Sequence, residues 1–137
     1  MTEVGKTPKK NAPPQRPTDA ELEILNILWQ RGASTVREVH QAISRTKPGA
    51  GYTTVLKLMQ IMAEKGLVRR DESQRAHVYE ARLAREQTQR QLIGDLLDRA
   101  FDGSATKLVM QALNAKRASA EELSTIREML DEFERGE

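Results

Sequence analysis

Residues 52–57 carry hydroxyl and ammonium groups whose types and spacing suit contact with nucleic-acid bases. Tyr52, Thr53 and Thr54 are consecutive, and Lys57 follows one helical turn later, so it faces the same way as the threonines. Threonine can bond base edges or phosphates and touch a thymine methyl group, and lysine can reach guanine acceptors. The phenol of Tyr52 can donate to a phosphate oxygen. The competing interpretation is an ordinary solvated helix face, because threonine pairs are common at helix starts.

A second group of potential cations follows within nine residues, namely Arg69, Arg70, Arg75 and His77. Short β-like runs hold these side chains, and a hairpin of this kind could lie along a nucleic-acid backbone or minor groove. The competing interpretation is an edge hairpin that its charges keep soluble. Ser34 and Thr35 form a third group, since they start a helix whose unbonded backbone N–H groups suit phosphate.

Three helices must position these groups. The first runs from a capping box at residues 18–21 to Gly32, and the second starts at Ser34 or Thr35. The third opens at residues 49–51 and ends near Gly66. Apolar residues at i, i+3, i+4 and i+7 give the third helix one buried face, formed by Val55, Leu58, Met59 and Met62.

The period then changes from helical to β-like. Residues 67–70 and 77–80 are short β-like runs, and the polar stretch 71–76 lies between them, which indicates a hairpin. Three helices followed by a hairpin is the order of a winged helix, in which the second helix of the helix-turn-helix enters the major groove. The expected fold class is therefore mainly α, an α+β winged helix with a β-hairpin wing.

From about Ala84 the chain is helical again, with apolar stripes on three segments. These stripes are too short to bury themselves, so they either fold back on the winged helix or pair with a second chain. A two-fold dimer matches palindromic half-sites, which favours a helical dimerisation segment. We therefore expect a basic arm over residues 1–17, a DNA-binding domain over 18–82 and a dimerisation domain over 83–137.

Charge is distributed unevenly along the chain. Residues 1–82 hold 14 Lys+Arg against 9 Asp+Glu, a net of +5, whereas residues 83–137 hold 8 against 11, a net of −3. A basic front half favours phosphate partners, and an acidic rear half suits another task. Residues 1–17 contain four of the five prolines and carry a net of +3, which predicts a disordered arm, either an inert tail or a groove contact.

Several function classes are excluded or disfavoured. The 137 residues include no cysteine and only two histidines, His40 and His77, so we expect no disulfide, no thiolate, no metal site and no cofactor. Acidic groups such as Asp95, Asp98 and Asp102 lie on solvated helix faces, and no nucleophile–base pair accompanies them, so an enzyme is not expected. Without a long apolar run or signal peptide, the expected setting is cytoplasmic, with no membrane insertion.

The pattern resembles the penicillinase-repressor (BlaI/MecI) family of bacterial winged-helix repressors over residues 17–135. Three stretches carry most of the resemblance: TDAELEILNILWQRG from Thr18, STVREVHQAI from Ser34 and YTTVLKLMQIMAEKGLV from Tyr52. The hairpin RAHVYEA (75–81), the distal LVMQAL (108–113) and the segment EELSTIREML (121–130) fit as well. The combination of the Tyr-Thr-Thr-Val start with a His-x-Tyr hairpin is specific.

The resemblance implies a homodimeric repressor that binds palindromic operators, with β-lactamase, penicillin-binding-protein or copper-handling genes as typical targets of the family. By position, it makes Thr53, Thr54 and Lys57 base-reading residues. It assigns contacts with the DNA backbone to Ser34, Thr35, Tyr52, Arg69, Arg70, Arg75 and His77. Together with the apolar stripes, it assigns a dimer interface to Leu92, Leu96, Leu97, Phe101, Leu108, Val109, Leu113, Ile126 and Leu130.

Two departures from the family's pattern bear on regulation. Penicillinase repressors are inactivated by a regulatory protease that cuts an Asn-Phe bond in the distal helix, and the equivalent dipeptide here is Gln111-Ala112. Copper-responsive relatives carry a C-terminal cysteine cluster, which this chain does not have. Two other functions stay open from the residues alone: an interaction module that no longer binds DNA, and a regulator that binds a small effector between its helices.

Overall fold

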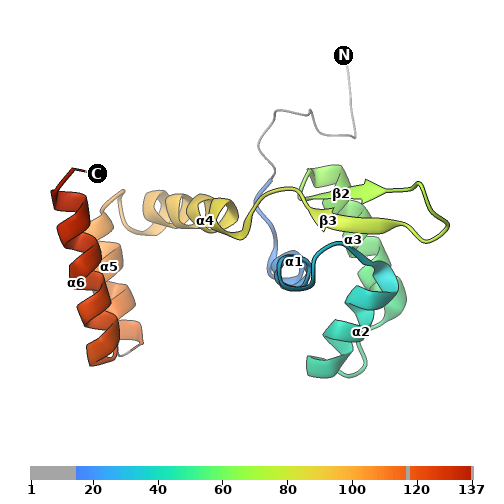
Figure 1. Cartoon of the computed structure of the whole chain (residues 1–137), viewed down its shortest axis with the longest axis horizontal. Coiled ribbons are helices and arrows are strands. Elements are labelled where there is room, and N and C mark those ends of the chain that lie inside the picture. Colours follow the sequence, from blue (N-terminus) through green and yellow to red (C-terminus); the bar gives the residue numbers. More distant parts are fainter. Residues whose placement is uncertain (1–14, 117, 137) are drawn as a thin grey trace, which may run out of the picture. The chain divides into compact units, whose positions relative to one another are not determined.

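The computed structural model describes residues 15–116 and 118–136, and the expected arm at 1–17 lies outside them except for its last three residues. The described residues form six helices and a three-stranded sheet (Figure 1). The chain divides into two compact units, up to Leu92 and from Ile93 onward, and the division falls inside helix α4. The first unit is a winged helix, as the sequence predicts.

The helices of the first unit are α1 (Asp19–Arg31), α2 (Val36–Thr46) and α3 (Tyr52–Lys65). Thr18 and Glu21 form the expected capping box on α1, with their two hydrogen bonds at 3.2 and 2.9 Å. Thr35 and Glu38 form a second box on α2, which the sequence reading did not identify. Gly66 ends α3 at φ 83°, a left-handed conformation that glycine adopts without steric cost.

The sheet has one strand more than the predicted hairpin. Strand β2 (Val68–Asp71) pairs antiparallel with β3 (Val78–Ala81), one residue later than each predicted run. Strand β1 (Ser34–Thr35) pairs with the other edge of β3, giving the order β1-β3-β2. A two-residue strand has no periodicity of its own, so only its tertiary pairing defines it.

The core of this unit is mostly aliphatic. It lies among α1, α2, α3 and the base of the hairpin, and the predicted face of α3 contributes to it, with Leu58 at its partly buried margin. The buried members are Ile24, Leu25, Leu28, Val36, Val39, Ile43, Val55, Met59, Met62, Leu67, Val68 and Tyr79.

Two polar contacts tie distant parts of the first unit together. The carboxylate of Glu21, only 3% exposed, accepts from Lys65 Nζ at 2.6 Å, so the start of α1 is joined to the end of α3. Trp29 packs on the core margin, and its indole N–H donates to the Leu83 carbonyl at 2.9 Å. The guanidinium of Arg85 lies over the same ring, 5.7 Å from its centroid.

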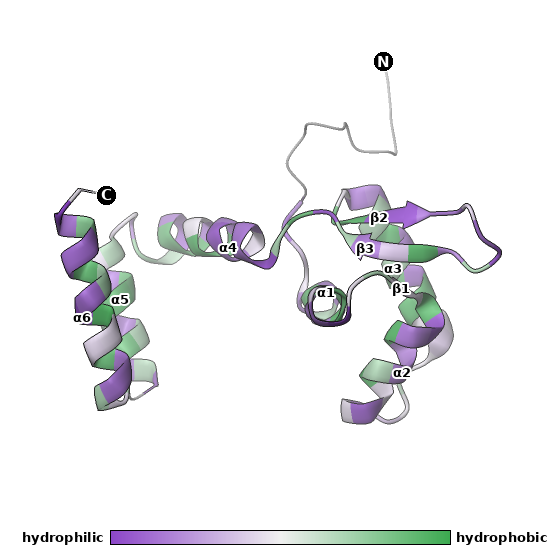
Figure 2. Ribbon diagram, viewed as in Figure 1, coloured by the Kyte–Doolittle hydropathy of each residue, from purple (hydrophilic) through white to green (hydrophobic). Residues whose placement is uncertain are grey.

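Helix α4 (Arg85–Ala100) crosses the division, and α5 (Ala105–Ala115) and α6 (Ala120–Glu134) belong to the second unit. A capping box formed by Ser119 and Glu122 starts α6. No side chain among residues 93–116 and 118–136 is buried in the single chain. Figure 2 shows hydrophobic residues along α5 and α6. Several of them are exposed in the single chain, namely Val109, Met110, Met129, Leu130 and Phe133.

Candidate nucleic-acid interface

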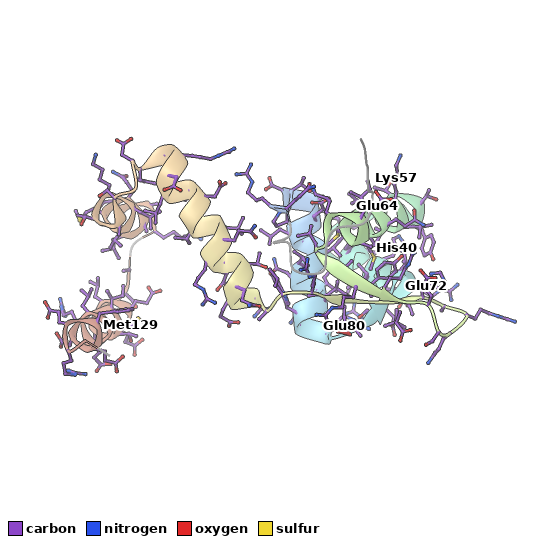
Figure 3. The ribbon with its side chains drawn as sticks, turned by 90° about the horizontal axis from the view of Figure 1, so that it is seen from above. His40, Lys57, Glu64, Glu72, Glu80 and Met129 are labelled. Carbon is purple, nitrogen blue, oxygen red and sulfur yellow. The ribbon has the colours of Figure 1, made fainter. Side chains whose placement is uncertain are left out.

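The N-terminal turn of α3 presents the predicted base-reading side chains to solvent. Thr53, Thr54 and Lys57 are all exposed, while Val55 between them points into the core (Figure 3 labels Lys57). Gly51 is the N-cap of α3 and supplies no side-chain hydrogen bond, so the first backbone N–H groups of this helix have no side-chain cap. Hydroxyls, an ammonium group and polarised N–H groups therefore share one exposed surface.

His40 fixes the turn that leads into this helix. Its Nε2 lies 2.7 Å from the Ala50 carbonyl oxygen, which can only accept, so Nε2 carries the proton. The imidazole also meets the ring of Tyr52 edge to face, with the centroids 5.7 Å apart and the planes at 77°. His40 thus contacts both Ala50, which lies two residues before α3, and Tyr52, the first residue of α3. In the sequence, His40 indicates only that histidines are too few for a metal site, and its spacing from Ala50 and Tyr52 does not predict these contacts.

A groove of about 570 Å³ lies between the start of α2, the face of α3 and the hairpin. Five of the predicted contact residues line it together, which are Thr35, Tyr52, Arg70, Arg75 and His77. Arg37 and Gln60 also line the groove and were not predicted. Their signal was present in the sequence: Arg37 falls in the first turn of α2, and Gln60 lies two turns after Thr53, on the same face of α3.

Two predicted contacts are placed differently. The Ser34 side chain is 1% exposed, and its hydroxyl donates to the Gly32 carbonyl at 2.9 Å, so it does not reach the surface. Arg69 lies outside the residues that line the groove, and its guanidinium is 3.7 Å from the carboxylate of Glu80 across the β2–β3 pair. Of the pair at the start of α2, only Thr35 has its side chain at the surface of the groove.

The hairpin is an ionic network as well as a set of cations. Arg70 lies 2.5 Å from Glu72. The hydrogen bond with the Tyr79 hydroxyl raises the pKa of Arg70 above its ordinary value, burial works against this, and the hydrogen bond and charge of Glu72 raise the pKa further. The backbone N–H of Ser73 donates to Asp71 Oδ1 at 2.9 Å and lowers the pKa of that carboxyl. This bond between the Asp71 carboxylate and the N–H two residues later shapes the turn of the hairpin.

The residues expected at the dimer interface are accessible in the single chain. Leu92, Leu97, Phe101, Leu108, Leu113 and Ile126 are half-buried, and Leu96, Val109 and Leu130 are exposed. Met110, Met129 and Phe133 are exposed too, and Phe133 is 76% exposed. The dipeptide Gln111-Ala112 lies inside α5, with both side chains exposed. Among the described residues, no helix could span a membrane and no group of three or more potential metal ligands occurs.

Three helices, a three-stranded sheet and an exposed second helix of a helix-turn-helix define a winged-helix protein of the kind that reads DNA. The sequence profile of the penicillinase repressor family matches residues 17–132, and the chain belongs to this family of transcriptional repressors. A transcriptional regulator BlaI of Mycobacterium tuberculosis is 34% identical over 119 residues, covering 86% of this chain and 85% of its own length.

A penicillinase repressor of Bacillus licheniformis is 24% identical over 115 residues, covering 84% of this chain and 89% of its own length. Both relatives therefore match along most of their length. The family match over residues 17–132 includes the winged helix, α4, α5 and most of α6. The predicted family is confirmed, and with it a role as a transcriptional repressor.

Proposed function

We propose that this chain is a homodimeric transcriptional repressor that binds palindromic operator DNA through α3 and the hairpin. The exposed N-terminal turn of α3, bordered by the cationic groove, is the observation that carries the proposal. Thr53, Thr54 and Lys57 have the chemistry of base contacts, and Arg37, Arg70 and Arg75 have the chemistry of phosphate contacts. Genes for β-lactamase or another antibiotic or stress response are the proposed targets, by analogy with the named relatives.

The apolar residues of α4, α5 and α6 support the homodimer. A unit in which no side chain is buried gains stability by covering those residues with a second copy, at about 25 cal/mol per Å² of apolar surface. A two-fold pair of winged helices would also place two α3 helices on successive major grooves, which is what palindromic half-sites require.

Selection of duplexes from a randomised pool by the full chain tests this proposal. We expect a palindromic consensus, two chains per duplex by light scattering, and an affinity that falls steeply between about 50 and 200 mM salt. Chromatin pull-down from the source organism should recover the same motif upstream of the regulated genes. Recovery of sequence-independent duplexes only, or of none, would overturn the proposal and favour a protein-interaction role for the C-terminal helices.

A further inference from the structure

One exposed stripe runs along α3 on the side opposite its buried face. Thr53, Lys57, Gln60 and Glu64 follow one another at i, i+4, i+7 and i+11, so they lie on one side of the helix. All four side chains are exposed, and Figure 3 labels Lys57 and Glu64. Since Thr53 and Lys57 are proposed base contacts, a polar side chain between them and the end of the stripe faces the same DNA groove.

Gln60 is the polar side chain of this stripe that has no role in the proposed complex so far. It lies in the third turn of α3 and lines the groove of about 570 Å³ together with Tyr52 and Arg70. No hydrogen bond joins its amide to another described residue. A primary amide has an acceptor oxygen and two donor hydrogens, so all of these are available to a partner outside the chain.

The position of Gln60 along α3 suits a base pair beyond the one that Thr53 reaches. Seven residues at 1.5 Å each separate the two along the helix axis by about 10 Å. This is close to three steps along B-DNA at about 3.4 Å per step. Homeodomains also read bases with residues of one helix that are separated by i and i+7. Glu64, one turn further on, has a carboxylate that phosphates repel, so the DNA-facing part of the stripe ends at Gln60.

We infer that Gln60 is a specificity-determining residue, which reads an adenine in the major groove. This inference rests on the proposed function. Adenine presents its N7 acceptor beside its N6 amino donor, and a glutamine amide matches both at once by donating to N7 and accepting from N6. A phosphate offers only acceptors and would leave the amide oxygen unused. Arg70 and Arg75, which line the same groove, already supply charged donors for phosphate.

The test compares Gln60→Ala and Gln60→Lys with the wild-type full chain. Each protein selects duplexes from a randomised pool. Each is then titrated with the tightest duplex that the wild type selects (the selected duplex) and with a mixed-sequence duplex of equal length and composition. Gln89→Ala and Gln89→Lys are the matched controls, since Gln89 is exposed on α4 and does not line the groove. Because both glutamines are exposed, the variants should fold, which melting curves verify.

We expect Gln60→Ala to lose the preference for adenine at one position of each half-site. Affinity for the selected duplex should fall by a factor of about 5 to 150 for each half-site, while affinity for the mixed-sequence duplex stays unchanged. Gln60→Lys should move the preference at that position from adenine to guanine, because lysine donates to O6 and N7 of guanine. The Gln89 variants should keep the wild-type consensus.

A change in the DNA identifies the atom that Gln60 contacts. 7-Deazaadenine at the assigned position removes the N7 acceptor and keeps the base pair. In one half-site it should weaken wild-type binding by a factor of about 2 to 12, the value of one hydrogen bond. The same replacement should leave the affinity of Gln60→Ala unchanged, because the contact is already absent. An equal loss in both proteins would assign N7 to another residue and overturn the inference.

The repeated selection can also reject the inference. Loss of preference at a base other than adenine would do so. Equal weakening of Gln60→Ala on the selected and mixed-sequence duplexes would assign Gln60 to a phosphate instead. If the wild type selects no sequence from the pool, the proposed function fails and this inference with it. If the wild type selects one and Gln60→Ala keeps every base preference, only this inference fails.

Discussion

Among the residues proposed to contact DNA bases, Lys57 is the one whose role can be tested most directly. It is exposed on α3, one turn after Thr53 and Thr54. Lys57→Ala should weaken binding to the selected duplex by about 1–3 kcal/mol, the value of one good base contact, or broaden the preferred sequence. Gel shift and a repeated selection measure the two effects. Lys116→Ala, with the same charge change at the end of α5, is the control. Unchanged affinity and preference would remove Lys57 from the base-reading set.

A comparison of Glu21 with Glu23 tests how much burial changes the contribution of an ion pair to stability. Its carboxylate is 3% exposed and is bound by Lys65, whereas Glu23 forms a largely exposed pair with Lys47 at 3.1 Å. Glu21→Gln leaves the ammonium group of Lys65 partly buried without its partner, so we expect unfolding to become easier by about 3 kcal/mol. Glu23→Gln should cost less than about 1 kcal/mol. Urea denaturation measures the free energy of unfolding of both variants, and an equal decrease in the two would contradict this account.

Some residue assignments could be made from the sequence and others could not. The exposed threonines and Lys57 follow from helical spacing, because the apolar stripe fixes which face of α3 is buried. The burial of Ser34 could not be foreseen, since it depends on a two-residue strand pairing with β3, which lies far along the chain. The pairing of Arg69 with Glu80 needs the strand register, which the loop 71–76 left open by several residues.

At the scale of elements, the turn between α2 and α3 controls how the reading helix is held. His40 donates to the Ala50 carbonyl and contacts Tyr52, so His40→Ala removes both restraints. We expect a loss of about 1 kcal/mol in stability, the net value of one hydrogen bond, and a several-fold loss in affinity for the selected duplex. Faster amide exchange at residues 50–54 should accompany it, measured by mass spectrometry.

His40→Gln provides the control, because its side-chain amide can still donate to the carbonyl. Partial recovery of affinity in this variant would assign the effect to the hydrogen bond. Loss of affinity without faster exchange in the turn would mean that His40 does not act through the start of α3.

The helices themselves could largely be predicted, because their signals are local. The capping box at the start of α1 and Gly66 at the end of α3 lie where the sequence predicts them, and a further capping box marks the start of α6. The capping box on α2 was not predicted, although the spacing of Thr35 and Glu38 in the sequence is that of a capping box. The hairpin was shifted by one residue, since its turn is shaped by Asp71 and Ser73 and not by a standard two-residue pattern.

At the scale of the whole molecule, the apolar side chains of α5 and α6 make self-association testable. Leu130 is 58% exposed, so a charge there should not disturb the fold of a single chain. We expect Leu130→Glu to dissociate the proposed dimer and to weaken operator binding by at least tenfold, because each half-site is then bound singly. Sedimentation across concentration measures the first effect and gel shift the second.

Ser124→Glu adds the same charge to an already exposed polar position of α6 and should leave both properties intact. A Leu130→Glu protein that sediments as the wild type would exclude Leu130 from the interface. The sequence identifies these apolar stripes but not what packs against them. The periodicity of a stripe is the same whether a second copy or another part of the same chain covers it.

The position of the single tryptophan has an optical consequence. Trp29 donates to the carbonyl of Leu83 and lies under Arg85, at the place where the winged helix continues into α4. Because the chain has no other indole, all of its tryptophan emission comes from this junction. If binding of a duplex or of a second chain alters the path from the hairpin into α4, the emission maximum and its quenching will report it without any label. The junction is therefore a built-in fluorescent probe, which can be followed during titration with DNA.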